Sequence, residues 1–218
     1  MLSQVGRPGQ YDGLLADAIQ RAYPDGAVHI IAHSMGGLDS RALIAHNFQG
    51  LSNPGRIVSL TTVSTPHRGT AVADLLAGPR PEGPHRLLYD GVDHAIHLLG
   101  VDTGALANLT TEEASRVPDV ARTHPHIRYR SYFASGRPGI LPTCFALALL
   151  HHYITVTTGQ ENDGLVALDS ARYGEFQEPF WHCDHADAVG HNLDTADQGG
   201  FCFNHFAAFD AIISQLTH

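Results

Sequence analysis

The sequence has no run of about 18 consecutive apolar residues, so no segment is expected to cross a membrane as a helix. It also lacks long charged runs and low-complexity segments. Its 43% of hydrophobic and 16% of charged residues are typical of a globular protein. A chain of 218 residues can bury a sizeable core, and we expect residues 1–218 to form a single domain.

Basic residues are scarce: 13 Lys and Arg stand against 22 Asp and Glu, which gives a net charge of −9 with neutral histidines. This charge argues against nucleic acid or an anionic membrane as the main partner. The sequence contains 16 histidines, and protonation towards about pH 5–6 would offset much of the imbalance.

Cysteine is also scarce, with only Cys144, Cys183 and Cys202. Their spacing is not that of a metal site, and three cysteines cannot all pair within one chain. A Cys183–Cys202 disulfide and three buried thiols both stay open, so the sequence does not fix the compartment. The first residues do not lead from a basic segment into an apolar one, and no signal peptide is expected.

The most informative segment follows the apolar residues 27–31, Ala-Val-His-Ile-Ile, which predict a short buried strand. The next residues read Ala-His-Ser-Met-Gly around Ser34, and a helix is predicted from about Gly37 to Asn47. A strand, a small-x-Ser-x-Gly turn and a helix are typical of the nucleophile elbow of α/β-hydrolases. We expect a strained turn at Ser34 with small neighbours at Ala32 and Gly36, because strand and helix pass close together there. An ordinary strand-to-helix turn is the alternative.

The remaining pattern predicts a mostly parallel sheet with helices on both faces and a lid-like helical insertion at about 78–118. Proline and glycine are frequent at the start of that insertion, where the chain is expected to leave the sheet. Residues 139–150 are expected to form a core helix rather than a surface patch. Strands are predicted at 56–63, 126–133 and 153–158, and helices at 11–23, 88–99 and 203–216.

A serine nucleophile needs a base, and the base needs an orienting carboxylate. In α/β-hydrolases the chain order is serine, acid, histidine. Asp163 is the best acid, because it lies in a turn-rich loop after the predicted strand 153–158; a solvated Asn-Asp-Gly turn is the alternative. His185 is the best base on position. Its rivals are His182, His191 and His205.

A zinc site is not expected from the His-x-x-x-His spacing of His29 and His33. These two residues straddle a strand and the turn after it. No helix would place both rings on one face.

Five segments in register resemble bacterial triacylglycerol lipases of the Pseudomonas/Burkholderia and Geobacillus type, over about residue 11 to the C-terminus. They are residues 32–41, 60–69, 108–112, 162–166 and 184–190. The resemblance implies an α/β-hydrolase that cleaves esters through an acyl-enzyme on Ser34, with His185 as base and Asp163 as its orienting acid. It also implies that the backbone N–H of Met35 contributes to the oxyanion hole.

The sequence departs from this family in two respects. The family's second oxyanion donor lies on a His-Gly loop upstream of helix 11–23, and only ten residues precede that helix here. The chain is therefore expected to lack the N-terminal strand and the oxyanion loop. The family's calcium site would use Asp187, yet no Asp or Glu occurs between Asp119 and Glu161 to serve as its partner. We expect no required metal or other cofactor, with Asp187 as the single weak calcium candidate.

The leading functional hypothesis is a lipase that cleaves acylglycerol esters, with a lipid or small ester as substrate and a possible oil–water interface as its site of action. A short-chain esterase and a phospholipase are the alternatives within the enzyme class. A catalytically inactive hydrolase-fold module that binds a ligand is the alternative of another class. The compartment is unknown from the residues, although the resemblance suggests secretion.

Overall fold

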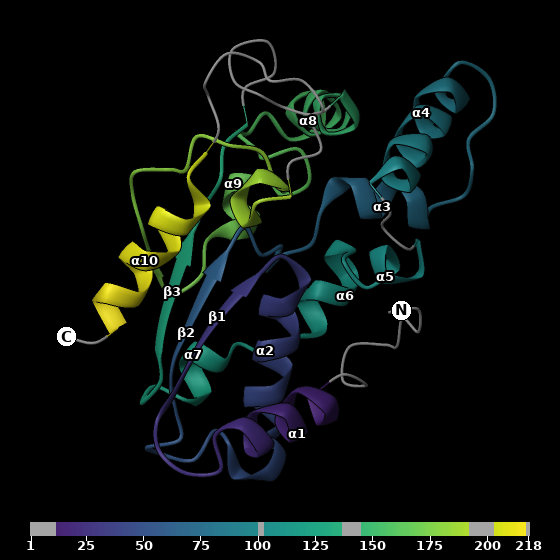
Figure 1. Ribbon diagram of the computed structural model, residues 1–218. Coiled ribbons are helices and arrows are strands. Elements are labelled where there is room, and N and C mark those ends of the chain that lie inside the picture. Colours follow the sequence, from purple (N-terminus) through teal and green to yellow (C-terminus); the bar gives the residue numbers. More distant parts are fainter. Residues whose placement is uncertain (1–11, 100–102, 137–144, 192–202, 217–218) are drawn as a thin grey trace.

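The computed structural model describes residues 12–99, 103–136, 145–191 and 203–216 (Figure 1). Cys144, Cys202 and the first eleven residues lie outside these ranges, and so do the expectations for a disulfide and for the N-terminal segment. Cys183 is buried, and this burial raises the pKa of its thiol.

Helices and short strands alternate along the chain, as the sequence pattern predicts. The helices are α1 (Asp12–Ala22), α2 (Met35–His46), α3 (Ala71–Ala77), α4 (His85–Leu98), α5 (Thr103–Ala107), α6 (Thr111–Arg116), α7 (Val120–Thr123), α8 (Phe145–Thr158), α9 (Leu168–Ala171) and α10 (His205–Leu216). The strands are β1 (Val28–His33), β2 (Ile57–Val63), β3 (Arg128–Tyr132) and β4 (Glu175–Phe176), and short 3₁₀ helices are η1 (Phe48–Gly50) and η2 (Asp187–Val189).

The four described strands form one sheet in the order β1-β2-β3-β4, and every neighbouring pair is parallel. Parallel strands place their carboxyl ends at a single edge, where β1 pairs His33 with Val63 of β2, and β2 pairs Val63 with Tyr132 of β3. The chain segments that follow β1, β2 and β3 therefore start side by side. This edge is where ligands bind in open α/β sheets.

Helices cover both faces of the sheet, which confirms the predicted fold class (Figure 1). On one face, Leu43 and Ile44 of α2 pack with Leu60 of β2 and with residues of α1 and α7. On the other face, Ile212 of α10 packs with Val63 and with residues from β3. The central strand β2 is buried along most of its length, as expected for a strand covered on both faces.

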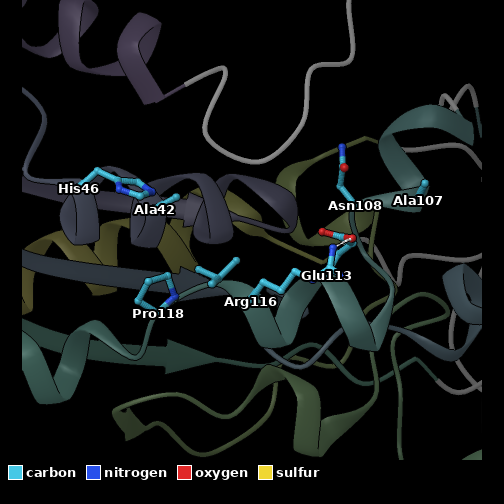
Figure 2. Close-up of a pocket in the computed structure, with 8 residues that line it drawn as sticks. Ala42, His46, Ala107, Asn108, Glu113, Arg116 and Pro118 are labelled. Carbon is cyan, nitrogen blue, oxygen red and sulfur yellow. Dashed lines mark hydrogen bonds and ion pairs between the residues drawn. The ribbon is translucent and has the colours of Figure 1, made fainter.

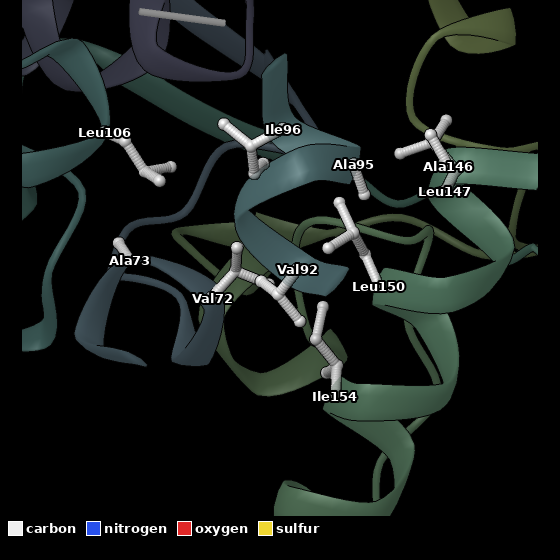
Figure 3. Close-up of a cluster of buried hydrophobic side chains, with 10 residues drawn as sticks. All are labelled: Val72, Ala73, Val92, Ala95, Ile96, Leu106, Ala146, Leu147, Leu150 and Ile154. Carbon is white, nitrogen blue, oxygen red and sulfur yellow. The ribbon is translucent and has the colours of Figure 1, made fainter. Parts of the chain in front are cut away.

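The chain between β2 and β3 carries α3 to α7, so the sequence correctly predicts helices in this insertion. Helices α3 and α4 pack against α8, which belongs to a later insertion between β3 and β4. Figure 3 shows the buried cluster they share, with Val92 and Ile96 of α4 close to Leu150 and Ile154 of α8. Whether residues 78–118 act as a lid stays a prediction.

The strand predicted at 153–158 is wrong, because these residues form the last turns of helix α8. β-Branched residues favour strands only weakly, and tertiary packing overrides that preference. Ile154 is fully buried in the cluster with α3 and α4, and the hydroxyls of Thr155, Thr157 and Thr158 donate to backbone carbonyls four residues earlier. The helix continues the apolar segment predicted at 139–150, of which residues 145–150 are described.

Candidate active site

Ser34 lies on a strained turn between β1 and α2, as the sequence predicts. Its φ of 54° and ψ of −132° fall in a region that residues with a side chain rarely adopt. Two hydrogen bonds over-determine this backbone: the Ser34 N–H donates to the Val63 carbonyl at 3.0 Å, and the Gly37 N–H donates to the Ser34 carbonyl at 3.1 Å. The turn places the Ser34 side chain at the carboxyl edge of the sheet, beside the first residues of α2.

Small residues are expected after the turn at Gly36 and Gly37, and the closer approach is at Gly37. A β-carbon on Gly36 would meet the β-carbon of Ala32 at 3.9 Å, which is ordinary contact. A β-carbon on Gly37 would lie 2.2 Å from Oγ1 of Thr65, on the loop after β2. Helix α2 thus approaches the β2 loop more closely than it approaches its own strand, and glycine is needed at position 37.

The structure brings Ser34, His185 and Asp163 into one hydrogen-bonded line. His185 Nε2 lies 2.9 Å from Oγ of Ser34, and His185 Nδ1 lies 2.8 Å from Oδ2 of Asp163. An ionised carboxylate only accepts hydrogen bonds, so Nδ1 carries the proton and donates to Asp163. Nε2 is then left with a lone pair that accepts the Ser34 hydroxyl proton, which is the arrangement of a nucleophile, a base and an orienting acid.

Asp163 is fully buried, and its two carboxylate oxygens have different partners: Oδ2 faces His185, and Oδ1 is held by the loop that follows Asp163. Its Oδ1 accepts the backbone N–H groups of Leu165 at 2.9 Å and Val166 at 2.8 Å. Burial alone would raise the pKa of this carboxyl, but the charge and hydrogen bond of His185, together with the two N–H donors, lower the pKa below its ordinary value. The lowered pKa favours the ionised carboxylate, which is the form that accepts the His185 Nδ1 proton.

The backbone holds His185 in register with Asp163. The His185 N–H donates to the Asp163 carbonyl at 2.9 Å, and the preceding Asp184 accepts the N–H groups of Ala186 and Asp187 at 2.9 Å each. Hydrogen bonds on both sides of His185 therefore hold its backbone in place. The rival histidines do not take this place: His182 is exposed, His205 is on α10, and His191 is exposed at the wall of the pocket that holds Ser34 and His185.

His33 precedes Asp163 in the chain and so does not fit the order serine, acid, histidine, but its ring contacts the site. Its ring lies 4.5 Å from the His185 ring, centroid to centroid, with the two planes tilted by 44°. Burial, followed by the nearby charge of His185, lowers the pKa of His33 to about 3. His33 is therefore neutral while His185 takes up and releases a proton. The sequence signal that could have predicted this contact is the position of His33 immediately before Ser34.

An apolar pocket of about 360 Å³ opens at Ser34 and His185. Its walls are mainly aliphatic and come from several segments, among them α5, α8, the loop after Asp163 and the loop after β2. They include Leu106, Leu109, Leu147, Leu165, Val166 and Pro66. A hydrocarbon group held here would have its polar end at the Ser34 hydroxyl.

A larger cavity of about 550 Å³ lies apart from these three residues, between α2, α5 and α6. Figure 2 shows Ala42 and His46 on one side of it and Asn108, Glu113 and Arg116 on the other. Arg116 forms ion pairs with Glu112 and Glu113, so its charge is already neutralised. Size alone therefore does not make this cavity the site of chemistry.

The loop after β2, residues 65–69, contains a buried polar network that is centred on His67. Arg41 Nη1 donates to His67 Nδ1 at 3.2 Å, so Nε2 carries the proton and donates to Oγ1 of Thr62 at 3.0 Å. The His67 ring stacks on Tyr173, as does the Arg41 guanidinium, each 4.5 Å from the Tyr173 ring centroid. This network ties the β2 loop, which lines the pocket, to α2 and to the chain before β4.

This network predicts a stability loss in acid. Burial, then the charges of Arg41 and Arg68, lowers the pKa of His67 well below 6.5, so only the unfolded chain binds this proton near pH 5. A depressed histidine pKa therefore stabilises the fold above the unfolded pKa, and that stability is lost as the pH falls below about 6.5. His67 alone should lower the free energy of unfolding by about 2 kcal/mol between pH 7 and pH 5. Denaturant unfolding at both pH values measures this.

The variant His67→Gln removes the titrating group and keeps a hydrogen-bonding side chain. Its stability at pH 7 should be lower, but the difference between pH 7 and pH 5 should shrink by about 2 kcal/mol. An unchanged pH difference in this variant would show that His67 is protonated in the folded protein.

The residues around Asp187 do not fit a calcium site. Asp187 begins η2, and the neighbouring Asp184 already accepts two backbone N–H groups. Within residues 12–99, 103–136, 145–191 and 203–216, no group of three or more His, Cys, Asp or Glu side chains could hold a metal ion. Calcium prefers six to eight oxygen ligands that include carboxylates.

The fold and the line from Ser34 to Asp163 define the class of protein: an α/β-hydrolase. No protein-family model matches the chain. Individual relatives do. The chain is 31% identical over 250 residues to a triacylglycerol lipase of Pseudarthrobacter phenanthrenivorans, covering 88% of this chain and 75% of the relative. It is 31% identical to the triacylglycerol lipase of Burkholderia plantarii, covering 88% of this chain and 67% of that relative.

The chain belongs to the triacylglycerol lipase family, which is a family of carboxylic ester hydrolases. A further relative, triacylglycerol lipase 2 of Saccharomyces cerevisiae, is 30% identical over 164 residues, and the chain spans 46% of its length. Solved structures support the fold. The mature Bacillus licheniformis lipase matches 99% of this chain and 76% of its own at a TM-score of 0.67 and 22% identity. A metagenomic carboxyl esterase matches 98% of this chain and 64% of its own, at a TM-score of 0.68 and 15% identity.

Among the described residues, no helix is long and apolar enough to cross a bilayer.

Proposed function

We propose that this protein hydrolyses acylglycerol esters through an acyl-enzyme on Ser34. In the first half, Ser34 Oγ attacks the ester carbonyl while His185 Nε2 takes the hydroxyl proton, and this proton then passes to the leaving alcohol. In the second half, His185 takes a proton from water, the hydroxide attacks the acyl-enzyme, and the carboxylic acid leaves as Ser34 regains its proton. Asp163 keeps Nδ1 protonated and stabilises the imidazolium in both halves.

The observation that carries this proposal is the pair of contacts of 2.9 Å and 2.8 Å that His185 makes with Ser34 and Asp163. The backbone N–H of Met35, the first residue of the 12-residue helix α2, would donate to the oxyanion. Such a donor is worth roughly 10²–10³ in rate. That the chain lacks the family's second donor, on a loop before α1, stays a prediction.

The substrate is proposed to be a neutral lipid. The pocket at Ser34 is lined mainly by aliphatic side chains, and a net charge of −9 favours neutral over anionic lipid. The relatives are named triacylglycerol lipases. Action at an oil–water interface and secretion both stay predictions. Short-chain esterase and phospholipase activities are the alternatives.

Hydrolysis of p-nitrophenyl esters of increasing chain length, with and without an emulsified triacylglycerol, tests this proposal. A lipase should hydrolyse emulsified tributyrin and longer triacylglycerols. Activity on soluble short esters alone would make the protein an esterase, and preferential release of fatty acid from phosphatidylcholine would make it a phospholipase.

We further propose that hydrolysis needs no metal ion. The expected result is that prior treatment with EDTA, followed by removal of the chelator, leaves kcat/KM unchanged within twofold. Adding calcium should not raise the rate. A loss of activity with EDTA that calcium reverses, and that Asp187→Asn reproduces, would show that calcium is required after all.

A further inference from the structure

A cavity of about 310 Å³, called the second cavity from here on, lies between α3, α4 and α5. Its inner wall is apolar and consists of Ala73 and Leu76 of α3 and Leu106 of α5. Ala77, His97 and Ala107 line its outer part and are exposed, so the cavity opens to solvent on that side. Neither Ser34 nor His185 lines it.

Leu106 lines both this second cavity and the pocket at Ser34. Its side chain is 2% exposed and belongs to the buried cluster that includes Ala73, Ile96 and Leu147. In Figure 3, Leu106 lies at one side of this cluster near Ala73 and Ile96, while Leu147 and Leu150 lie at the other side. Leu106 is therefore the residue that borders both cavities.

Three polar residues, Tyr89, Asp93 and His97, also line this cavity, and each has a hydrogen-bond or ion-pair partner. His97 Nδ1 lies 2.8 Å from the carbonyl oxygen of Asp93 and 3.7 Å from its carboxylate, and the Tyr89 hydroxyl donates to the Leu76 carbonyl at 3.4 Å. These pairs leave the aliphatic inner wall as the surface that a ligand would contact. A hydrocarbon chain fits such a wall, since its burial is favourable by roughly 25 cal/mol per Å².

We propose that the second cavity is a distal acyl-chain subsite which Leu106 closes off, so that Leu106 sets the longest acyl chain the enzyme accepts efficiently. This inference rests on the proposed ester hydrolysis at Ser34. An acyl chain attached there fills the pocket until its end meets the Leu106 side chain. Carbons beyond that point gain no apolar contact, and each methylene that is buried raises kcat/KM by about fourfold.

The variant Leu106→Ala should join the two cavities and move the preferred chain length upward. On p-nitrophenyl esters from butyrate to palmitate, the maximum of kcat/KM should shift by at least two carbons. The ratio of kcat/KM for the ester two carbons beyond the wild-type maximum to that at the maximum should rise by roughly 16-fold, which is two steps of about fourfold.

Leu147→Ala is the matched control. Leu147 is equally buried, lies in the same cluster and lines the same pocket at Ser34, but it does not line the second cavity. Both variants remove the same three carbon atoms from one pocket. Only Leu106→Ala should extend the preferred chain, and Leu147→Ala should stay within one carbon of the wild type.

Two further variants protect the test against misfolding. Leu106→Val shortens the same side chain with less disturbance and should shift the profile in the same direction by a smaller amount. Leu106→Ala combined with Ala77→Phe should refill the second cavity and restore the wild-type profile. Ala77 is exposed at the end of α3 and does not line the pocket at Ser34.

Failure of this inference differs from failure of the proposed function. If the Leu106 variants hydrolyse butyrate and react with a fluorophosphonate but keep the wild-type profile, the distal subsite is wrong and the ester hydrolysis stands. An equal shift in Leu147→Ala also overturns the subsite. If the wild type hydrolyses no ester and does not react with the probe, the proposed function itself is wrong.

Discussion

Replacing Ser34 by alanine is expected to lower kcat for ester hydrolysis by about 10⁶-fold, close to the limit of detection. The reason is that acyl transfer through this site begins with the Ser34 oxygen, which lies 2.9 Å from the nitrogen that takes its proton. Alanine at this position leaves the pocket in place, so binding of a product fatty acid should change little. Steady-state kinetics on a soluble p-nitrophenyl ester, with a thermal unfolding curve for each variant, measures the effect.

Ser64 provides a matched control for this variant. Like Ser34, it directly follows a strand and has a positive φ, of 45°; unlike Ser34, it is fully buried. Its Oγ accepts the Ala134 N–H at 3.1 Å, which joins the ends of β2 and β3. Ser64→Ala should lower the melting temperature but keep kcat within a few-fold of the wild type. Equal losses in both variants would mean that Ser34 matters for the sheet edge rather than for the chemistry.

Asp163→Asn is expected to lower kcat by about 10⁴-fold while KM changes little. The Asn oxygen can still accept the N–H groups of Leu165 and Val166, so the loop keeps its shape. The amide NH₂ would then face His185 Nδ1 and donate to it, which places the imidazole proton on Nε2. An Nε2–H cannot accept the Ser34 proton. Kinetics at a series of pH values, together with thermal unfolding, measures the loss.

The exposed Asp169, six residues further along the same segment, is the matched control. Asp169→Asn removes the same charge and should leave kcat and KM at wild-type values. A wild-type kcat in Asp163→Asn would show that the carboxylate orients nothing and that this buried charge is purely structural.

The strand, turn and helix around Ser34 could be predicted because they follow from local sequence. Apolar residues precede the turn, and glycines follow it where the backbone needs them. The order of Ser34, Asp163 and His185 could also be predicted from the segments that resemble the lipase family, although Asp163 follows helix α8 and not the strand expected before it. The structure adds the distances that link these three side chains.

Other features depend on contacts between distant segments and could not be predicted from local patterns. Residues 153–158 look like a strand, yet they complete α8 because Ile154 is buried against α3 and α4. The need for glycine at position 37 comes from Thr65, 28 positions away, whose Oγ1 would lie 2.2 Å from an added β-carbon. The two-sided position of Leu106 depends on how α3, α4 and α5 pack, which no periodicity indicates.

The central claim is that His185, oriented by Asp163, makes the Ser34 hydroxyl nucleophilic. The most direct test is labelling with a fluorophosphonate, followed by mass spectrometry of the peptide that contains residue 34, in the wild type and in His185→Gln. The account predicts stoichiometric labelling on Ser34 in the wild type and a loss of labelling in folded His185→Gln. Equal labelling of Ser34 in both proteins, or labelling of the wild type at a different residue, would contradict it.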